Sequence, residues 1–135
     1  MSVLVDARPH GTAVRAAIAA ALGTAHVYDH GKVPGANGNE GTLPEIFVLV
    51  AIERRYSPVL RSAHAGNAGW RVLTTALGRT VAESEWAQAR VAAALNEQRL
   101  TVAGAPTTRI QLESTTAPKF DDGRFAADAF YTYAH

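Results

Sequence analysis

The chain of 135 residues contains no cysteine. Disulfide bridges, a thiolate nucleophile and a thiolate metal site are therefore excluded. Long hydrophobic runs are also absent: runs such as Ile46–Ile52 fall far short of the roughly 20 residues that a membrane-spanning helix needs. The first residues lack a basic segment followed by an apolar one, so we expect no secretory signal. From these absences we expect no membrane partner.

An excess of charge of one sign is missing too, because 13 Lys and Arg residues face 12 Asp and Glu residues. A net charge of +1 supplies no bulk attraction to nucleic acid. With 47% hydrophobic and 19% charged residues, the composition is that of a folded protein. The length fits one domain, which we expect to span residues 1–135.

The stretch Leu43–Tyr56 organises the predicted fold. Its centre, Ile46–Ile52, is rich in β-branched and aromatic side chains, which favours a strand buried on both faces at the middle of a sheet. Periodicity alone does not separate this strand from a buried helix of the same length. We predict the strand and expect the other segments to cover it.

Two helices are predicted from apolar periodicity and capping signals. The first covers about residues 8–22, with Asp6 as its N-cap and Gly23 after its last turn. The second begins after Thr80, which forms a T-x-x-E capping box with Glu83, and runs to about Gln98.

The second helix carries apolar residues on two sides. Val91 and Leu95 face one way, and a stripe of mostly small residues faces another: Ala82, Trp86, Ala89 and Ala93. A helix of this kind commonly packs on a sheet and also touches something else. The second contact is a hint of oligomerisation.

Alternating polar and apolar residues predict further strands, at residues 25–29, 70–79, 100–102, 107–115 and 125–133. Ile110 and Leu112 should point inward, and Pro118–Gly123 should form a turn. The order is α-β-β-β-α-β-β. We predict an α+β fold with two helices packed on one mostly antiparallel sheet.

No constellation meets the tests for an active site, and we expect no cofactor. The loop that begins at Gly31 matches no phosphate-binding glycine motif. His26, Asp29 and His30 lie close enough to suggest a metal site, but on a strand Asp29 would point away from the two histidines. We favour exposed histidines at a loop edge and predict no metal.

Two long polar connections, His30–Leu43 and Ser57–Gly69, flank the strand of the central stretch. Arginines gather beside the second, at positions 54, 55, 61 and 71. A nucleic-acid surface would carry interleaved aromatic residues, and only Tyr56 and Trp70 flank this cluster. A solvated strand end, a ring lumen and a subunit interface all remain compatible with it.

The order and spacing of several segments resemble tail terminator proteins of long-tailed actinobacteriophages. The segments are H-V-Y-D, G-K-V-P-G-A-N-G-N-E-G-T-L-P, I-F-V-L-V-A-I-E-R-R-Y, G-W-R-V-L-T-T-A-L-G-R-T-V-A-E-S-E-W-A and D-D-G-R-F-A-A-D-A-F-Y-T-Y. The resemblance covers nearly the whole chain after residue 8. No single segment is a diagnostic motif.

The resemblance implies a non-enzymatic virion protein without a cofactor. It implies a homo-oligomeric ring, usually a hexamer, at the head-proximal end of the tail. Such a ring caps the tube of major tail protein, stops its polymerisation and joins the head–tail connector, or neck, proteins. Genomic DNA passes through the lumen without specific binding, and assembly takes place in the host cytoplasm.

We expect the ring contacts to come from the two polar connections, the arginine cluster and the second helix, at Lys32, Asn37, Asn39, Arg54, Arg55, Arg61, Val91 and Leu95. A neck ring on the head side of the joint is the alternative within the virion. A small ligand-binding or enzymatic α+β domain, with polar groups such as His26, His30 and Arg54 near one sheet end, is the alternative outside it.

Overall fold

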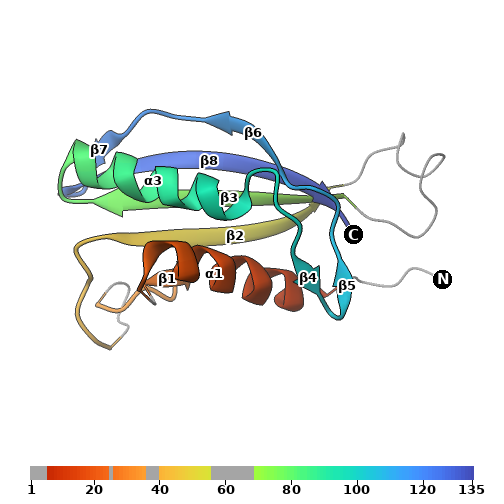
Figure 1. The fold of residues 1–135 in the computed structure, drawn as a ribbon. Coiled ribbons are helices and arrows are strands. Elements are labelled where there is room, and N and C mark those ends of the chain that lie inside the picture. The colour runs from red at the N-terminus through yellow and green to blue at the C-terminus, as the bar shows by residue number, and fades with distance from the viewer. Residues whose placement is uncertain (1–5, 25, 36–39, 56–68) are drawn as a thin grey trace.

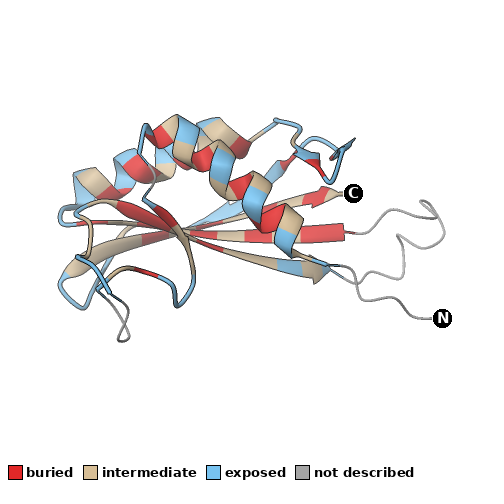
Figure 2. Cartoon of the chain, turned by 90° about the horizontal axis from the view of Figure 1, so that it is seen from below, coloured by how far each residue is buried: buried red, intermediate tan, exposed pale blue. Residues whose placement is uncertain are grey.

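The computed structural model describes residues 6–24, 26–35, 40–55 and 69–135. These residues form two layers, a six-stranded sheet and two helices on the same side of it (Figures 1 and 2). The helices are α1 (Arg8–Leu22) and α3 (Val81–Leu95). The strands of the sheet are β1 (Val27–Asp29), β2 (Phe47–Arg55), β3 (Gly69–Gly78), β6 (Gln111–Thr115), β7 (Lys119–Asp121) and β8 (Arg124–Ala134). A separate short hairpin consists of β4 (Thr101–Val102) and β5 (Ala105–Pro106).

The strand order is β1-β2-β3-β8-β6, with β7 pairing beside the start of β8. Only β1 and β2 pair in parallel, so the predicted α+β fold with a mostly antiparallel sheet is confirmed. The prediction that the stretch around Ile46–Ile52 is central and buried on both faces is wrong. β3 occupies the middle, and β2 buries Val48 and Val50 while Leu49 is half-buried. Both described helices lie on one side, so within residues 6–24, 26–35, 40–55 and 69–135 no helix covers the other face of β2 (Figure 2).

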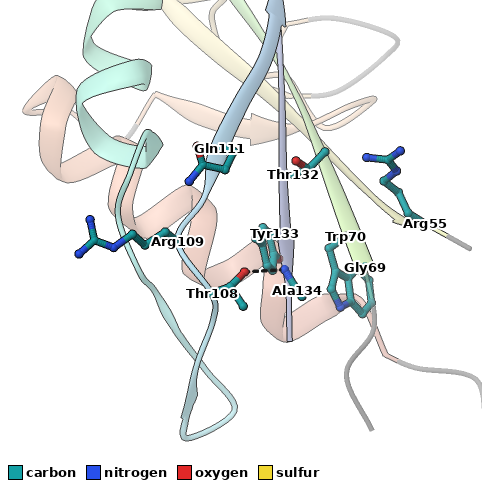
Figure 3. A pocket seen from close by; sticks show the side chains of 9 residues that line it. All are labelled: Arg55, Gly69, Trp70, Thr108, Arg109, Gln111, Thr132, Tyr133 and Ala134. Carbon is teal, nitrogen blue, oxygen red and sulfur yellow. Dashed lines mark hydrogen bonds between the residues drawn. The ribbon is translucent and has the colours of Figure 1, made fainter. Parts of the chain in front are cut away.

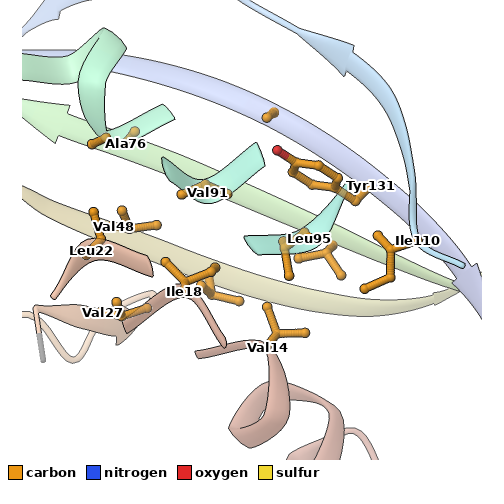
Figure 4. Packing of buried hydrophobic residues seen from close by; sticks show 14 of the residues in the cluster. Val14, Ile18, Leu22, Val27, Val48, Ala76, Val91, Leu95, Ile110 and Tyr131 are labelled. Atoms are coloured by element: carbon orange, nitrogen blue, oxygen red, sulfur yellow. The ribbon is translucent and has the colours of Figure 1, made fainter. Parts of the chain in front are cut away.

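The hydrophobic core fills the space between the helices and the sheet (Figure 4). α1 contributes a stripe at helical spacing, Val14, Ile18 and Leu22, as the periodicity predicts. From the sheet come the fully buried residues Val48, Val50, Val72, Ala129 and Tyr131. Burial raises the pKa of the Tyr131 hydroxyl to about 12, so this group is neutral at physiological pH.

Helix α3 packs on the sheet through a different face from the predicted one. Val91 and Leu95 are fully buried in the core, on a stripe with Ser84 and Ala87, so they cannot form a subunit interface. The stripe predicted from small residues is exposed instead, and Trp86 on it is 42% exposed. The core stripe is hard to recognise in the sequence because it contains a polar residue, Ser84. The buried hydroxyl of Ser84 donates to the carbonyl of Ala76 at 2.9 Å. A hydrogen bond of this kind removes the cost of burying a polar side chain.

The start of α3 lies against the end of β3. Gly78 permits this approach, because a Cβ there would come within 2.6 Å of the Cβ of Glu83. Thr80 adopts an extended conformation and its hydroxyl accepts from the Glu83 backbone N–H at 3.1 Å. The predicted N-cap is therefore confirmed, although the helix ends at Leu95, three residues before Gln98.

Replacing Thr80 with alanine should lower the free energy of unfolding by about 1 kcal/mol, because the first turn of α3 loses an acceptor. Urea unfolding followed by circular dichroism measures this change. Thr42→Ala is the matched control, since Thr42 is exposed and has no hydrogen bond within the described residues. Equal midpoints for the two variants would contradict a capping role for Thr80.

Candidate functional site

The face of the sheet opposite the helices carries half-buried apolar side chains, and we call it the open face. Its central residues are Leu49, Ala51, Leu73, Leu77, Ala126 and Phe130. Near the β1–β2 connection the face is covered, because Phe47 is only 3% exposed and Tyr28 packs edge-on against its ring. The rest of the open face is mostly apolar, apart from Thr75 and Asp128, whose side chains share a 2.7 Å hydrogen bond. No helix in the described part of the chain lies above it (Figure 2).

One end of the open face carries a chain of ion pairs. Glu113 on β6 contacts both Arg55, at 3.3 Å, and Arg71, at 3.1 Å. Arg71 also reaches Glu53 at 3.5 Å and places its guanidinium 4.1 Å from the centre of the Phe130 ring. Pairs this exposed contribute little stability, so they serve mainly to hold the side chains in place.

A pocket of about 310 Å³ opens beside this end of the sheet, and we call it the end pocket. Figure 3 shows its lining, which comes from the ends of four strands and the segment before β6. Arg55 and Arg109 lie on opposite sides, with Trp70 and Tyr133 between them. Ala134 is held by its N–H, which donates to the Thr108 hydroxyl at 2.8 Å.

His10 of α1 stacks behind these aromatic residues. Its ring lies 3.9 Å from the Trp70 ring, and its Nδ1 shares a 2.6 Å hydrogen bond with the Tyr133 hydroxyl. Burial, with a smaller contribution from the neighbouring His135, lowers the pKa of His10 to about 4. His10 is therefore neutral at physiological pH and acts as part of the core.

The β7–β8 hairpin ends in a tight turn at the opposite end of the sheet. Asp122 and Gly123 both have positive φ, as an Asp-Gly hairpin turn requires. Phe120 is 68% exposed, and its only ring contact among the described residues is with Phe125. Asp121 is also exposed and, like Asp122, has no ion-pair partner in the described part of the chain. We call Phe120, Asp121 and Asp122 the acidic tip.

The predicted contact residues scatter over the molecule. Lys32 is exposed in the β1–β2 connection, Arg55 lines the end pocket, and Arg54 is half-buried at the end of β2. Asn37, Asn39 and Arg61 lie outside the described residues. Sequence reasoning missed Arg109 and Phe120. The signals that could have found them are the polar–apolar alternation through β6 for Arg109 and the Asp-Gly turn after β7 for Phe120.

Within the described residues, no group of three or more His, Asp or Glu side chains is arranged to hold a metal ion. His26 and His30 are exposed there, and Asp29 forms an ion pair with Arg15 instead. No helix in the described part of the chain is long and apolar enough to cross a membrane.

No family model matches the chain, and no curated protein matches it. A solved structure described as the virion of a native gene transfer agent particle contains a chain with a TM-score of 0.67, 18% identity and 92% coverage of both chains. The fold is shared with a virion chain. A second solved structure, whose name states no function, has a TM-score of 0.61 and 11% identity, covering 93% of this chain and 89% of its own. Likeness at such identities shows the fold alone.

Proposed function

We propose that this chain is a structural virion protein and, more specifically, a tail terminator. In this role a ring of subunits, expected to be a hexamer, caps the head-proximal end of the tail tube and stops its polymerisation. The observation that carries the proposal is the shared fold with a gene transfer agent virion chain over nearly the full length of both chains. The resemblance of the sequence segments to actinobacteriophage tail terminators supplies the finer role.

The distribution of exposed surface supports a ring subunit. A terminator subunit contacts two neighbours, the tail tube and the neck, so it needs several separate contact surfaces. The open face, the outward side of α3 around Trp86, the end pocket and the acidic tip are four such surfaces. Apolar surface at several of them is typical of proteins that bury it on assembly.

The proposed partners are other copies of this chain, the major tail tube protein and a head–tail connector or neck protein. Genomic DNA would pass through the ring without specific binding. Arg55 supports this assignment, because its guanidinium already pairs with Glu113 at 3.3 Å. A lumen that gripped phosphates with several free arginines would slow the passage of DNA. In this proposal the protein is not an enzyme, has no cofactor and belongs to the tail of the virion.

Two other functions remain as outcomes of the test. A neck ring has the same assembly chemistry but would bind the head side of the joint and leave tube growth unchanged. A small ligand-binding domain would use the end pocket, whose volume of about 310 Å³ lies at the lower limit for such sites.

Polymerising the major tail tube protein of the same virus in the presence of this protein tests the proposal. We expect a marked shortening of the tubes in electron micrographs, with added density at one end, because a bound cap blocks further addition. Adding the protein after polymerisation is the control and should cap the tubes without shortening them. Tubes of unchanged length with bare ends would contradict the terminator role.

A further inference from the structure

We propose that subunits join head to tail, with the acidic tip of one copy seated in the end pocket of the next. This inference rests on the proposed function, which requires a homo-oligomer, and it assigns the contact that links neighbouring copies. Two surfaces at opposite ends of the subunit carry it, the end pocket and the acidic tip.

The end pocket has an excess of positive charge. Three arginines lie in or beside it, Arg55, Arg71 and Arg109, against two glutamates, Glu53 and Glu113. Glu113 pairs with two of the arginines. Arg109 is exposed and has no ion-pair partner among the described residues. Between the arginines lie Trp70 and Tyr133, whose rings are nearly buried, at 1% and 5% exposed, and the exposed lining of the pocket is mostly apolar (Figure 3). The pocket therefore suits a ligand that combines an aromatic or apolar group with a carboxylate.

The acidic tip has this combination. Phe120 exposes more of its side chain than any other large apolar residue in the described part of the chain, and Asp121 and Asp122 follow it directly. The neighbouring Arg124 does not neutralise them, because its Nη1 donates to the carbonyl of Glu45 at 2.7 Å and its guanidinium lies over the Phe47 ring. The exposed ring and two unpaired carboxylates are complementary in polarity and charge to the end pocket.

A subunit cannot fill its own pocket with its own tip. The tip lies where β8 begins, since Phe120 pairs with Phe125, and the pocket lies where β8 ends, at Thr132 and the two residues after it (Figure 1). The strand from Phe125 to Thr132, at about 3.3 Å per residue, spans about 23 Å. A contact between unlike surfaces at opposite ends is heterologous, and repeating it produces a ring where the rotation closes. The occupant of the pocket is therefore a second copy of this chain.

Chemical crosslinking tests this contact directly, because the chain has no cysteine of its own. The reporter variant carries Lys119→Cys beside the tip and Gln111→Cys in the pocket lining, both at exposed positions that leave the proposed contact residues intact. A short bis-maleimide should join copies of this variant into a ladder that ends at a closed oligomer. The control pair, Lys119→Cys with His26→Cys, should give no ladder, because His26 lies near the tip end of the sheet.

Charge reversal then tests the pairing. In the reporter variant, Arg109→Glu alone, or Asp121→Lys with Asp122→Asn, should reduce the crosslinked ladder about tenfold, and combining both changes should restore much of it. Asparagine at position 122 removes the charge and tolerates the positive φ of the turn. Phe120→Ser should also reduce the ladder about tenfold or more. Circular dichroism checks that each variant keeps its fold, which we expect because all of these positions are exposed.

The outcomes separate this inference from the proposed function. If the unmodified protein shortens tail tubes but the reporter gives no ladder, or no more than the control pair, the head-to-tail contact is refuted and the terminator role stands. If the ladder is absent and Arg109→Glu instead weakens binding of duplex DNA, the pocket binds phosphate and the contact is again refuted. If the protein neither caps tubes nor crosslinks, both proposals fail.

Discussion

Val91→Glu is expected to unfold the protein rather than release soluble monomers. The Val91 side chain has no exposed surface and packs between α3 and the sheet, as Figure 4 shows. The substitution removes its packing and places a carboxylate where no partner is available, which costs about 4 kcal/mol or more. Domains of this size have about 5–15 kcal/mol of stability in total, so little would remain.

Trp86→Glu is the matched variant on the same helix. Trp86 is 42% exposed, and the guanidinium of Arg90 lies 5.3 Å from its ring centre. Losing that contact costs about 1 kcal/mol at most, so this variant should stay folded. Thermal unfolding followed by circular dichroism compares the two. A folded Val91→Glu protein with the wild-type melting temperature would contradict the orientation of α3 described here.

Acidification is expected to destabilise the protein through His10. The folded-state pKa of His10 is about 4 and lies below its unfolded value of 6.5. The folded state therefore resists protonation while the unfolded state accepts it. The contribution of His10 to the free energy of unfolding is complete above its pKa in the unfolded state. It falls as the pH drops toward the pKa in the folded state and is constant below that value. Between about pH 7.5 and about pH 5 the free energy of unfolding should fall by about 2 kcal/mol from this group.

Urea unfolding at a series of pH values measures this slope. His10→Phe should flatten it, because the ring remains stacked on Trp70 but no longer titrates. The variant also leaves the Tyr133 hydroxyl without its partner, so the slope rather than the absolute stability is the readout. His26→Gln is the control, since His26 is exposed, and should keep the wild-type slope. An unchanged slope in His10→Phe would show that other groups carry the pH dependence.

Local signals predicted most of the elements. The α1 stripe, the Thr80 cap and the alternation of β8 all reflect contacts that a segment makes with its neighbours in sequence or with one buried face. Leu112 shows the limit of such patterns. The alternation predicted that Leu112 points inward. It lies on β6 opposite Tyr131, yet it is 39% exposed because β6 is the edge strand of the sheet.

The remaining features depend on tertiary pairing. Helix α3 buries Val91 and Leu95 on a stripe that also contains Ser84, and Ser84 fits there only because its hydroxyl donates to the carbonyl of Ala76 on β3. β7 was missed because its three residues form a strand only by pairing with β8. The end pocket brings Arg55 and Arg109 together through the strand order β2-β3-β8-β6, which no local pattern specifies.

The central claim is that this chain assembles with itself on a tail tube. Light scattering of the purified protein, alone and mixed with the major tail tube protein of the same virus, measures its molar mass in each state. We expect a closed ring of about hexamer mass, either in solution or formed only on the tubes, because several weak contacts act together on a template. A stable monomer or dimer that ignores the tubes would contradict the claim and favour the end pocket as a ligand site.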